Sequence, residues 1–98
     1  GFISTSSGFA SGFINGIPYF RLQMYIKNSS TQSISVKNII IFDKETNKVL
    51  SNSENVNASI MSKSEKTLYW NNPTQTSNIG ILITYEWRGE TYSTYTYR

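Results

Sequence analysis

The stretch from residue 79 to residue 97 reads IGILITYEWRGETYSTYTY, and it decides the fold class. Residues 79–88 alternate apolar and polar side chains, which is the pattern of a strand with one buried face. Arg88-Gly89 can form a two-residue turn, because glycine accepts the positive φ that tight hairpins need. Residues 90–97 are rich in threonine and tyrosine, which favour strands. We therefore predict a β-hairpin over this stretch.

A two-residue turn also fixes the register of the hairpin, since residues pair in order outward from the turn. Side chains alternate between the two faces of a strand, so the register assigns each of them to a face. We predict that Tyr95 and Tyr97 point outward with Leu82, whereas Trp87 continues an inward stripe. The predicted pairs are Trp87 with Glu90, Tyr85 with Tyr92, Ile83 with Thr94 and Leu82 with Tyr95.

The rest of the chain shows similar short alternating stretches from Phe9 onward, separated by turn residues. Asn15-Gly16 predicts a hairpin between strands at residues 9–14 and 19–27. No stretch has the spacing of an amphipathic helix. Further strands are predicted at residues 34–42, 48–51, 56–61 and 65–70. Seven or eight short strands predict an all-β fold, an immunoglobulin-like two-sheet Greek-key sandwich. A small five-stranded OB-like barrel is the alternative.

The 98 residues suit one domain. We predict that residues 9–98 form it and that residues 1–8, which contain Ser4-Thr5-Ser6-Ser7-Gly8, are a flexible N-terminal segment or tether. Such a tether would suit a chain held at a membrane through a removed N-terminal anchor.

The composition excludes most catalytic chemistry. The chain has no cysteine and no histidine, so it lacks disulfides, thiolate ligands and the usual general base at neutral pH. Its acids fall near turns, where carboxylates are usually solvated surface charges. Asp43, Glu45 and Asn47 alternate like the start of a calcium loop, but the glycine and the distal glutamate of such a loop are absent. We expect a non-enzymatic protein with no cofactor and no bound metal.

Charge and aromatic content leave two binding alternatives open. The net charge is +3, but the lysines are spread along the chain, which argues against a nucleic-acid surface. An OB-like nucleic-acid-binding domain would need lysines and aromatic side chains interleaved on one face. A carbohydrate-binding module would need Trp70 or several tyrosines to form an exposed platform.

The third predicted strand points to a binding surface. In Ile39-Ile40-Ile41-Phe42 one alternate pair must enter the core, so the other pair stays outside. If this strand shares a sheet with residues 79–97, the pair left outside joins the outward tyrosines in an apolar patch. Such patches mark interfaces. The competing interpretation is that Phe2, Ile3 and Phe9 of the N-terminal segment cover the patch. The candidate partner-binding residues are Leu82, Tyr95, Tyr97, Ile39 and Ile41.

Three strings resemble bacterial immunoglobulin-like accessory domains of the FxLYD type, over roughly residues 19–92. They are Ile26-Lys27-Asn28-Ser29-Ser30, then Ile39-Ile40-Ile41-Phe42-Asp43 where that family has Phe-x-Leu-Tyr-Asp, and Thr46-Asn47-Lys48-Val49-Leu50. The chain departs from the family in having isoleucine for phenylalanine and asparagine for glycine. The resemblance implies a β-sandwich that is a non-catalytic part of a bacterial surface protein.

We therefore expect a non-catalytic interaction or accessory module of a bacterial surface, secreted or periplasmic protein. The expected partner is a protein or a surface polysaccharide. A second copy of the chain, paired through a sheet face, is a further candidate.

Overall fold

Eight β-strands make up the regular structure of the computed structural model, which describes residues 3–71 and 78–97. This part of the chain contains no helix that could cross a membrane. The strands are β1 (Ile3–Ile14), β2 (Ile17–Asn28), β3 (Ile34–Asp43), β4 (Val49–Ser53), β5 (Ala58–Ile60), β6 (Ser64–Asn71), β7 (Ile79–Trp87) and β8 (Glu90–Tyr97).

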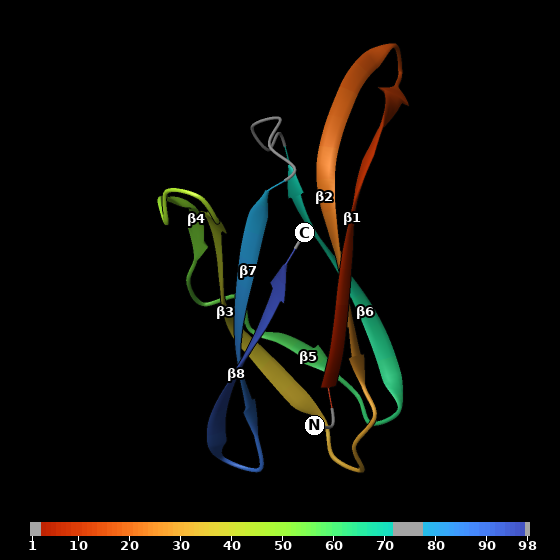
Figure 1. The fold of residues 1–98 in the computed structure, drawn as a ribbon. Coiled ribbons are helices and arrows are strands. Elements are labelled where there is room, and N and C mark those ends of the chain that lie inside the picture. Colours follow the sequence, from red (N-terminus) through yellow and green to blue (C-terminus); the bar gives the residue numbers. More distant parts are fainter. Residues whose placement is uncertain (1–2, 72–77, 98) are drawn as a thin grey trace.

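The strands form two sheets that pack face to face (Figure 1). The smaller sheet has 3 strands in the order β1-β2-β6, and the larger has 5, in the order β4-β3-β7-β8 with β5 also paired to β3. The chain crosses to the larger sheet after β2, returns for β6 and crosses again for β7 and β8. This topology confirms the predicted two-sheet Greek-key sandwich. The alternative of a five-stranded barrel is wrong.

The core lies between the sheets and is built from alternating side chains. Leu22, Met24 and Ile26 of β2 are at most 4% exposed, and Ile81 and Ile83 of β7 are each 1% exposed. These residues alternate with partly or fully exposed neighbours, as expected for a strand with one face in the core. The core is completed by Ile34, Val36, Ile39, Ile41, Ala58, Ile60, Ile79 and Tyr85.

Two tight turns fix the registers of the hairpins. Asn15 and Gly16 have φ of 52° and 80°, and Arg88 and Gly89 have φ of 52° and 79°. Two consecutive residues with positive φ match the right-handed twist of the flanking strands. All four predicted pairs between β7 and β8 are confirmed.

A β-bulge in β3 decides which of its side chains enter the core. Val36 pairs with Tyr85 and Asn38 with Thr84, so Lys37 is an extra residue without a partner on β7. The Lys37 carbonyl accepts a hydrogen bond of 2.9 Å from the Val56 N–H. An extra residue reverses the alternation of the strand. The side chains of β3 that enter the core therefore belong to even-numbered residues before the bulge and to odd-numbered residues after it.

The N-terminal segment differs from its prediction. Residues 3–8 belong to β1, which pairs with β2 from Ile3 opposite Asn28 to Ile14 opposite Ile17. Ile3 and Phe9 pack against the core. The predicted tether over residues 1–8 is therefore wrong for residues 3–8, and residues 1–2 lie outside the described part. Serine and glycine suggested a loop, but β-pairing along the whole of β2 overrides local composition.

A buried polar cluster holds together the end of the sandwich opposite the β1–β2 turn. The Asn28 side chain is fully buried, and its Nδ2 donates to the carbonyls of Gln32 at 2.8 Å and Ile60 at 3.1 Å. Its Oδ1 accepts from the Ser30 N–H at 3.0 Å and from the Ser30 hydroxyl at 2.6 Å. The Trp87 indole donates to the Ser30 Oγ at 3.2 Å. Because these groups satisfy each other, the β2–β3 loop is joined to β5 and β7 without an orphaned amide.

The bulge predicts that two adjacent isoleucines contribute very differently to the free energy of unfolding. Ile41→Ala should lower the free energy of unfolding by about 2–5 kcal/mol, because it leaves a cavity in the core. Ile40→Ala removes the same atoms from the outer face and should cost about 1 kcal/mol or less. Denaturant melts of the two variants measure the difference. Equal losses, or a larger loss for Ile40→Ala, would contradict the observed position of the bulge.

Candidate functional site: the outer face of the larger sheet

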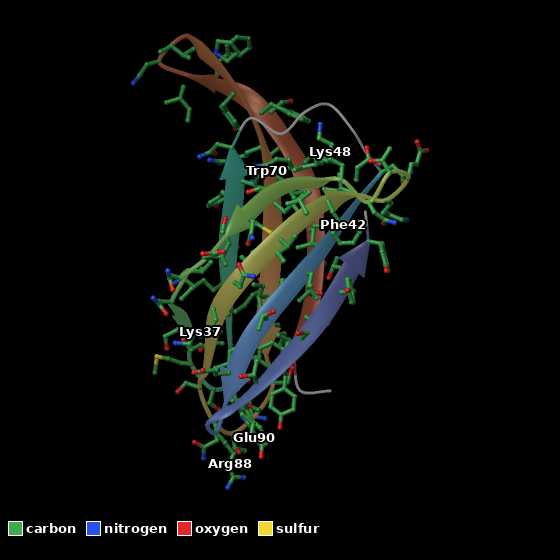
Figure 2. All side chains as sticks on the ribbon, turned by 90° about the vertical axis from the view of Figure 1, so that its left-hand side faces the viewer. Lys37, Phe42, Lys48, Trp70, Arg88 and Glu90 are labelled. Carbon is green, nitrogen blue, oxygen red and sulfur yellow. The ribbon has the colours of Figure 1, made fainter. Side chains whose placement is uncertain are left out.

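An apolar patch covers the outer face of the larger sheet at the end where β3 and β8 finish. Phe42 is the last residue but one of β3 and lies opposite Gly80, which in turn lies opposite Tyr97. The next row inward consists of Ile40, Leu82 and Tyr95. Figure 2 shows Phe42 near this end of the molecule. We call this cluster the outer patch, and it consists of Ile40, Phe42, Val49, Leu82, Tyr95 and Tyr97.

The structure brings three of the five predicted partner-binding residues together and excludes two. Leu82, Tyr95 and Tyr97 lie on the outer face as predicted, and the two tyrosines are 56% and 60% exposed. Ile39 and Ile41 are buried in the core, at 4% and 2% exposed. Their assignment to the binding surface is therefore wrong.

Ile40 and Phe42 supply the apolar pair of β3 that stays outside the core. They are half-buried on the outer face, because the bulge at Lys37 puts the odd-numbered isoleucines of this strand inside. Alternation requires that one pair stays outside the core, but it does not decide which pair.

The rings of the outer patch have a defined arrangement. Tyr95 and Tyr97 are stacked, with ring centroids 6.1 Å apart and an angle of 5° between their planes. Phe42 meets Tyr95 edge to face at 6.3 Å. The Lys44 ammonium lies 4.8 Å from the centre of the Tyr97 ring, within cation–π range. The two tyrosines thus form a parallel stacked pair, with one cation over the Tyr97 ring.

Gly80 makes this arrangement possible. A Cβ at this position would lie 2.4 Å from Cζ of Phe42, closer than any real contact allows. The Phe42 ring therefore lies directly over the Gly80 backbone, and its edge reaches toward β8. An aromatic ring that covers a glycine on the neighbouring strand also shields that part of the backbone from water.

The described part of the N-terminal segment, from Ile3 onward, does not cover the outer patch. Phe9 and Ile3 belong to β1 in the smaller sheet and pack against the core, so they are not available to the outer face of the larger sheet. Phe2 lies outside the described residues. Val49, on the edge strand β4 opposite Phe42, is itself 54% exposed. Within the described part of the chain, the patch is open to solvent.

The Asp43 turn has a structural role. The Asp43 Oδ1 accepts hydrogen bonds from the N–H groups of Glu45 at 2.8 Å and Thr46 at 3.2 Å, and Asn47 adopts φ of 58°. These hydrogen bonds and the positive φ shape the hairpin turn between β3 and β4. The described residues contain no group of three or more acidic, histidine or cysteine side chains that could hold a metal ion.

Two tyrosines on the inner side have shifted pKa values for ordinary reasons. Burial raises the pKa of Tyr85 above 10.0, and a hydrogen bond of 2.8 Å to the Glu90 carboxylate raises the pKa of Tyr92. The two rings stack at 5.7 Å. Neither shift brings a proton donor or acceptor into the physiological range, so we assign no catalytic role to them.

Neither tryptophan forms a sugar platform. Trp70 and Trp87 are half-buried and pack against the core. Trp70 lies opposite Leu22 and shares its inward face (Figure 2). The exposed aromatic surface of the larger sheet therefore belongs to the two tyrosines of β8.

The candidate binding residues named from the sequence did not include Ile40, Phe42 and Val49 of the patch or its neighbour Lys44. One signal for Phe42 was present: Lys37 and Asn38 are consecutive polar residues between two apolar runs, which is typical of a bulge that shifts the alternation. Val49 follows from the pairing of β4 with β3, and a single sequence does not show that pairing.

A double-mutant cycle tests the contact between Gly80 and Phe42. Gly80→Ala should lower the free energy of unfolding by about 1–3 kcal/mol, because the new methyl group displaces the ring. In a Phe42→Ala background the same change should be neutral or slightly stabilising, since glycine weakens a strand interior by roughly 0.5–1 kcal/mol.

Gly8→Ala is the matched control, because Gly8 also lies within a strand but has open space where its Cβ would be. It should be close to neutral in both backgrounds. If Gly80→Ala costs the same with and without the Phe42 ring, the ring does not lie over Gly80.

Comparisons with known proteins show the fold alone. No family model and no curated protein matches the sequence. Among solved structures, the X-ray structure of Northeast Structural Genomics Consortium target SoR45 is similar, with a TM-score of 0.58 and 15% sequence identity. The alignment covers 96% of this chain and 81% of that chain. The sandwich is therefore an arrangement that a very different sequence also adopts.

Proposed function

We propose that this chain is a non-catalytic interaction module that binds a protein partner through the outer patch. The observation that carries the proposal is the exposure of Tyr95 and Tyr97 beside half-buried Phe42 and Leu82 on one open sheet face. Contiguous exposed apolar surface is costly in water and tends to mark interfaces. Tyrosine is enriched there because it supplies a large, stiff contact area and a hydroxyl.

The surroundings of the patch also suit a protein interface. The row beyond Leu82 is polar on the same face: Thr84 lies between Asn38 and Ser93, and its hydroxyl lies 3.5 Å from that of Ser93. An apolar centre beside polar side chains is the usual anatomy of a protein-binding surface.

We place the module in a bacterial surface, secreted or periplasmic protein. The support is the resemblance of Ile39-Ile40-Ile41-Phe42-Asp43 and Thr46-Asn47-Lys48-Val49-Leu50 to FxLYD-type domains. Both strings lie in β3, the Asp43 turn and β4, next to the outer patch.

Carbohydrate binding is the second candidate, and the exposure of two tyrosines on one face favours it. Tyr95 and Tyr97 are 56% and 60% exposed, and an exposed aromatic ring can stack on a sugar ring. The alternative of an OB-like nucleic-acid-binding domain required a five-stranded barrel. The fold is a two-sheet sandwich, so the fold no longer supports that alternative.

The test is the combined change Tyr95→Ser and Tyr97→Ser. Both side chains are exposed, so the free energy of unfolding should stay within about 1 kcal/mol of the parent. Immobilised parent protein captures partners from the envelope and secreted proteins of the source organism, and the affinity of each captured protein is then measured. The double variant should bind at least about tenfold more weakly, because exposed aromatic anchors dominate such interfaces.

Tyr69→Ser is the control, because Tyr69 is 50% exposed but belongs to the smaller sheet. It should leave the affinity unchanged. Equal affinity of the double variant and the parent for every captured protein would contradict the proposal. Binding of soluble polysaccharide that the double variant loses would instead support the second candidate. A dimer that the double variant loses in sedimentation would identify the partner as a second copy.

A further inference from the structure

The β1–β2 hairpin extends beyond the rest of the smaller sheet. The third strand, β6, ends at Asn71, which lies opposite Arg21, whereas β2 begins four residues earlier at Ile17. Figure 1 shows the hairpin projecting past the ends of the other strands, and Figure 2 shows it curving away from the sandwich. Within the described residues, the last part of the hairpin is a two-stranded ribbon without a third strand.

The tip of this ribbon is apolar on both of its faces. Ile14 lies opposite Ile17 on one face, and Phe13 lies opposite Pro18 on the other. Phe13 is 75% exposed, Ile14 is 56% exposed and Ile17 is 68% exposed. Residues 1–20 include no Asp, Glu, Lys or Arg, so no charged side chain belongs to the tip. We call Phe13, Ile14, Ile17 and Pro18 the hairpin tip.

A collar of aromatic rings around one cation lies just below the hairpin tip. The Arg21 guanidinium carbon is 4.9 Å from the centre of the Tyr19 ring and 4.3 Å from that of Tyr69. Tyr19 also lies over Gly12 of the facing strand, where a Cβ would be 3.0 Å from its ring. The collar is therefore held in place on the ribbon by specific contacts.

The spacing between tip and collar matches the depth of a lipid interface. Strands rise about 3.4 Å per residue, so Tyr19 lies roughly 7 Å and Arg21 roughly 14 Å behind Ile17. Segments that bind at a membrane surface bury apolar side chains about 5–10 Å into the boundary between headgroups and acyl chains. Tyrosine is enriched at the headgroup level, and an arginine there can reach lipid phosphates.

We propose that the hairpin tip inserts into the boundary between the headgroups and acyl chains of a lipid bilayer and that Tyr19 and Arg21 contact the headgroups. A lipid surface surrounds what enters it, so it suits a tip that is apolar on both faces. A protein groove or a second copy would need only one apolar face. The collar is a second feature that a purely apolar partner site would not require.

The insertion is shallow and separate from the outer patch. Backbone groups at the edges of a two-stranded ribbon have no partner strand, so deep burial in hydrocarbon would leave them unsatisfied. The expected binding is therefore weak and reversible. The outer patch belongs to the other sheet, so loss of one site need not affect the other.

The absence of cysteine allows a direct test with a single fluorescent label. Ile14→Cys carries an environment-sensitive dye at the hairpin tip, and Met61→Cys, 71% exposed in the turn after β5, carries it at the opposite end as the control. The probes are phosphatidylcholine vesicles, with and without phosphatidylglycerol. The dye at position 14 should brighten and shift to the blue with vesicles, and the dye at position 61 should not change.

An unlabelled variant provides the second measurement. Phe13→Ser combined with Ile17→Ser should lower vesicle co-sedimentation at least about tenfold, because two large apolar side chains are lost from the interface. Its thermal melt should match that of the parent, since both side chains are exposed. The Tyr95→Ser and Tyr97→Ser variant should still bind vesicles, which separates this proposal from the function of the outer patch.

Three results would overturn the proposal. The first is no change of the dye at position 14 with either kind of vesicle. The second is an equal change at positions 14 and 61. The third is a change at position 14 that depends on protein concentration or on added protein instead of lipid, which would assign the hairpin tip to a second copy or another protein.

Discussion

The single extra residue in β3 is the constraint on which the rest of the structure depends. Ile34 and Val36 enter the core from even positions, and regular alternation would bring Asn38 in after them. The bulge at Lys37 instead pairs Asn38 with Thr84 on the outer face and delivers Ile39 and Ile41 to the core. The Asn38 side chain is thus kept out of the core, although its Oδ1 is buried and has no hydrogen-bond partner among the described residues. The consequence is that Ile40 and Phe42 must lie outside.

The outward position of Ile40 and Phe42 also determines the packing on the outer face of β7 and β8. Phe42 lies over Gly80 and reaches Tyr95, which stacks on Tyr97. The outer patch therefore follows from the packing of β3 against the core. The neighbouring strands accommodate it, since β7 has a glycine under the Phe42 ring and β8 has tyrosines beyond it. The exposure of two tyrosines beside this apolar pair is the feature on which the proposed interaction function rests.

The sequence was informative wherever one residue type settles the local geometry. Arg88-Gly89 and Asn15-Gly16 set the turns, and the turns set the registers, so the placement of Tyr95 and Tyr97 followed without a structure. The sequence did not show on which face of β3 Ile39 lies. The bulge that decides this depends on how neighbouring strands pair, and local strand propensity carries no information on that pairing. Residues 3–8 were misassigned for a similar reason, since their order comes from pairing with β2.

The position of the bulge is tested most directly by measuring which isoleucine methyl groups of β3 meet water. A soluble paramagnetic compound broadens the NMR signals of solvent-accessible methyl groups and leaves buried ones sharp. The bulge at Lys37 predicts strong broadening for Ile40 and little for Ile39 and Ile41. Broadening of Ile39 and Ile41 with a protected Ile40 would contradict it, because the bulge, the core and the outer patch would then all be assigned to the wrong face.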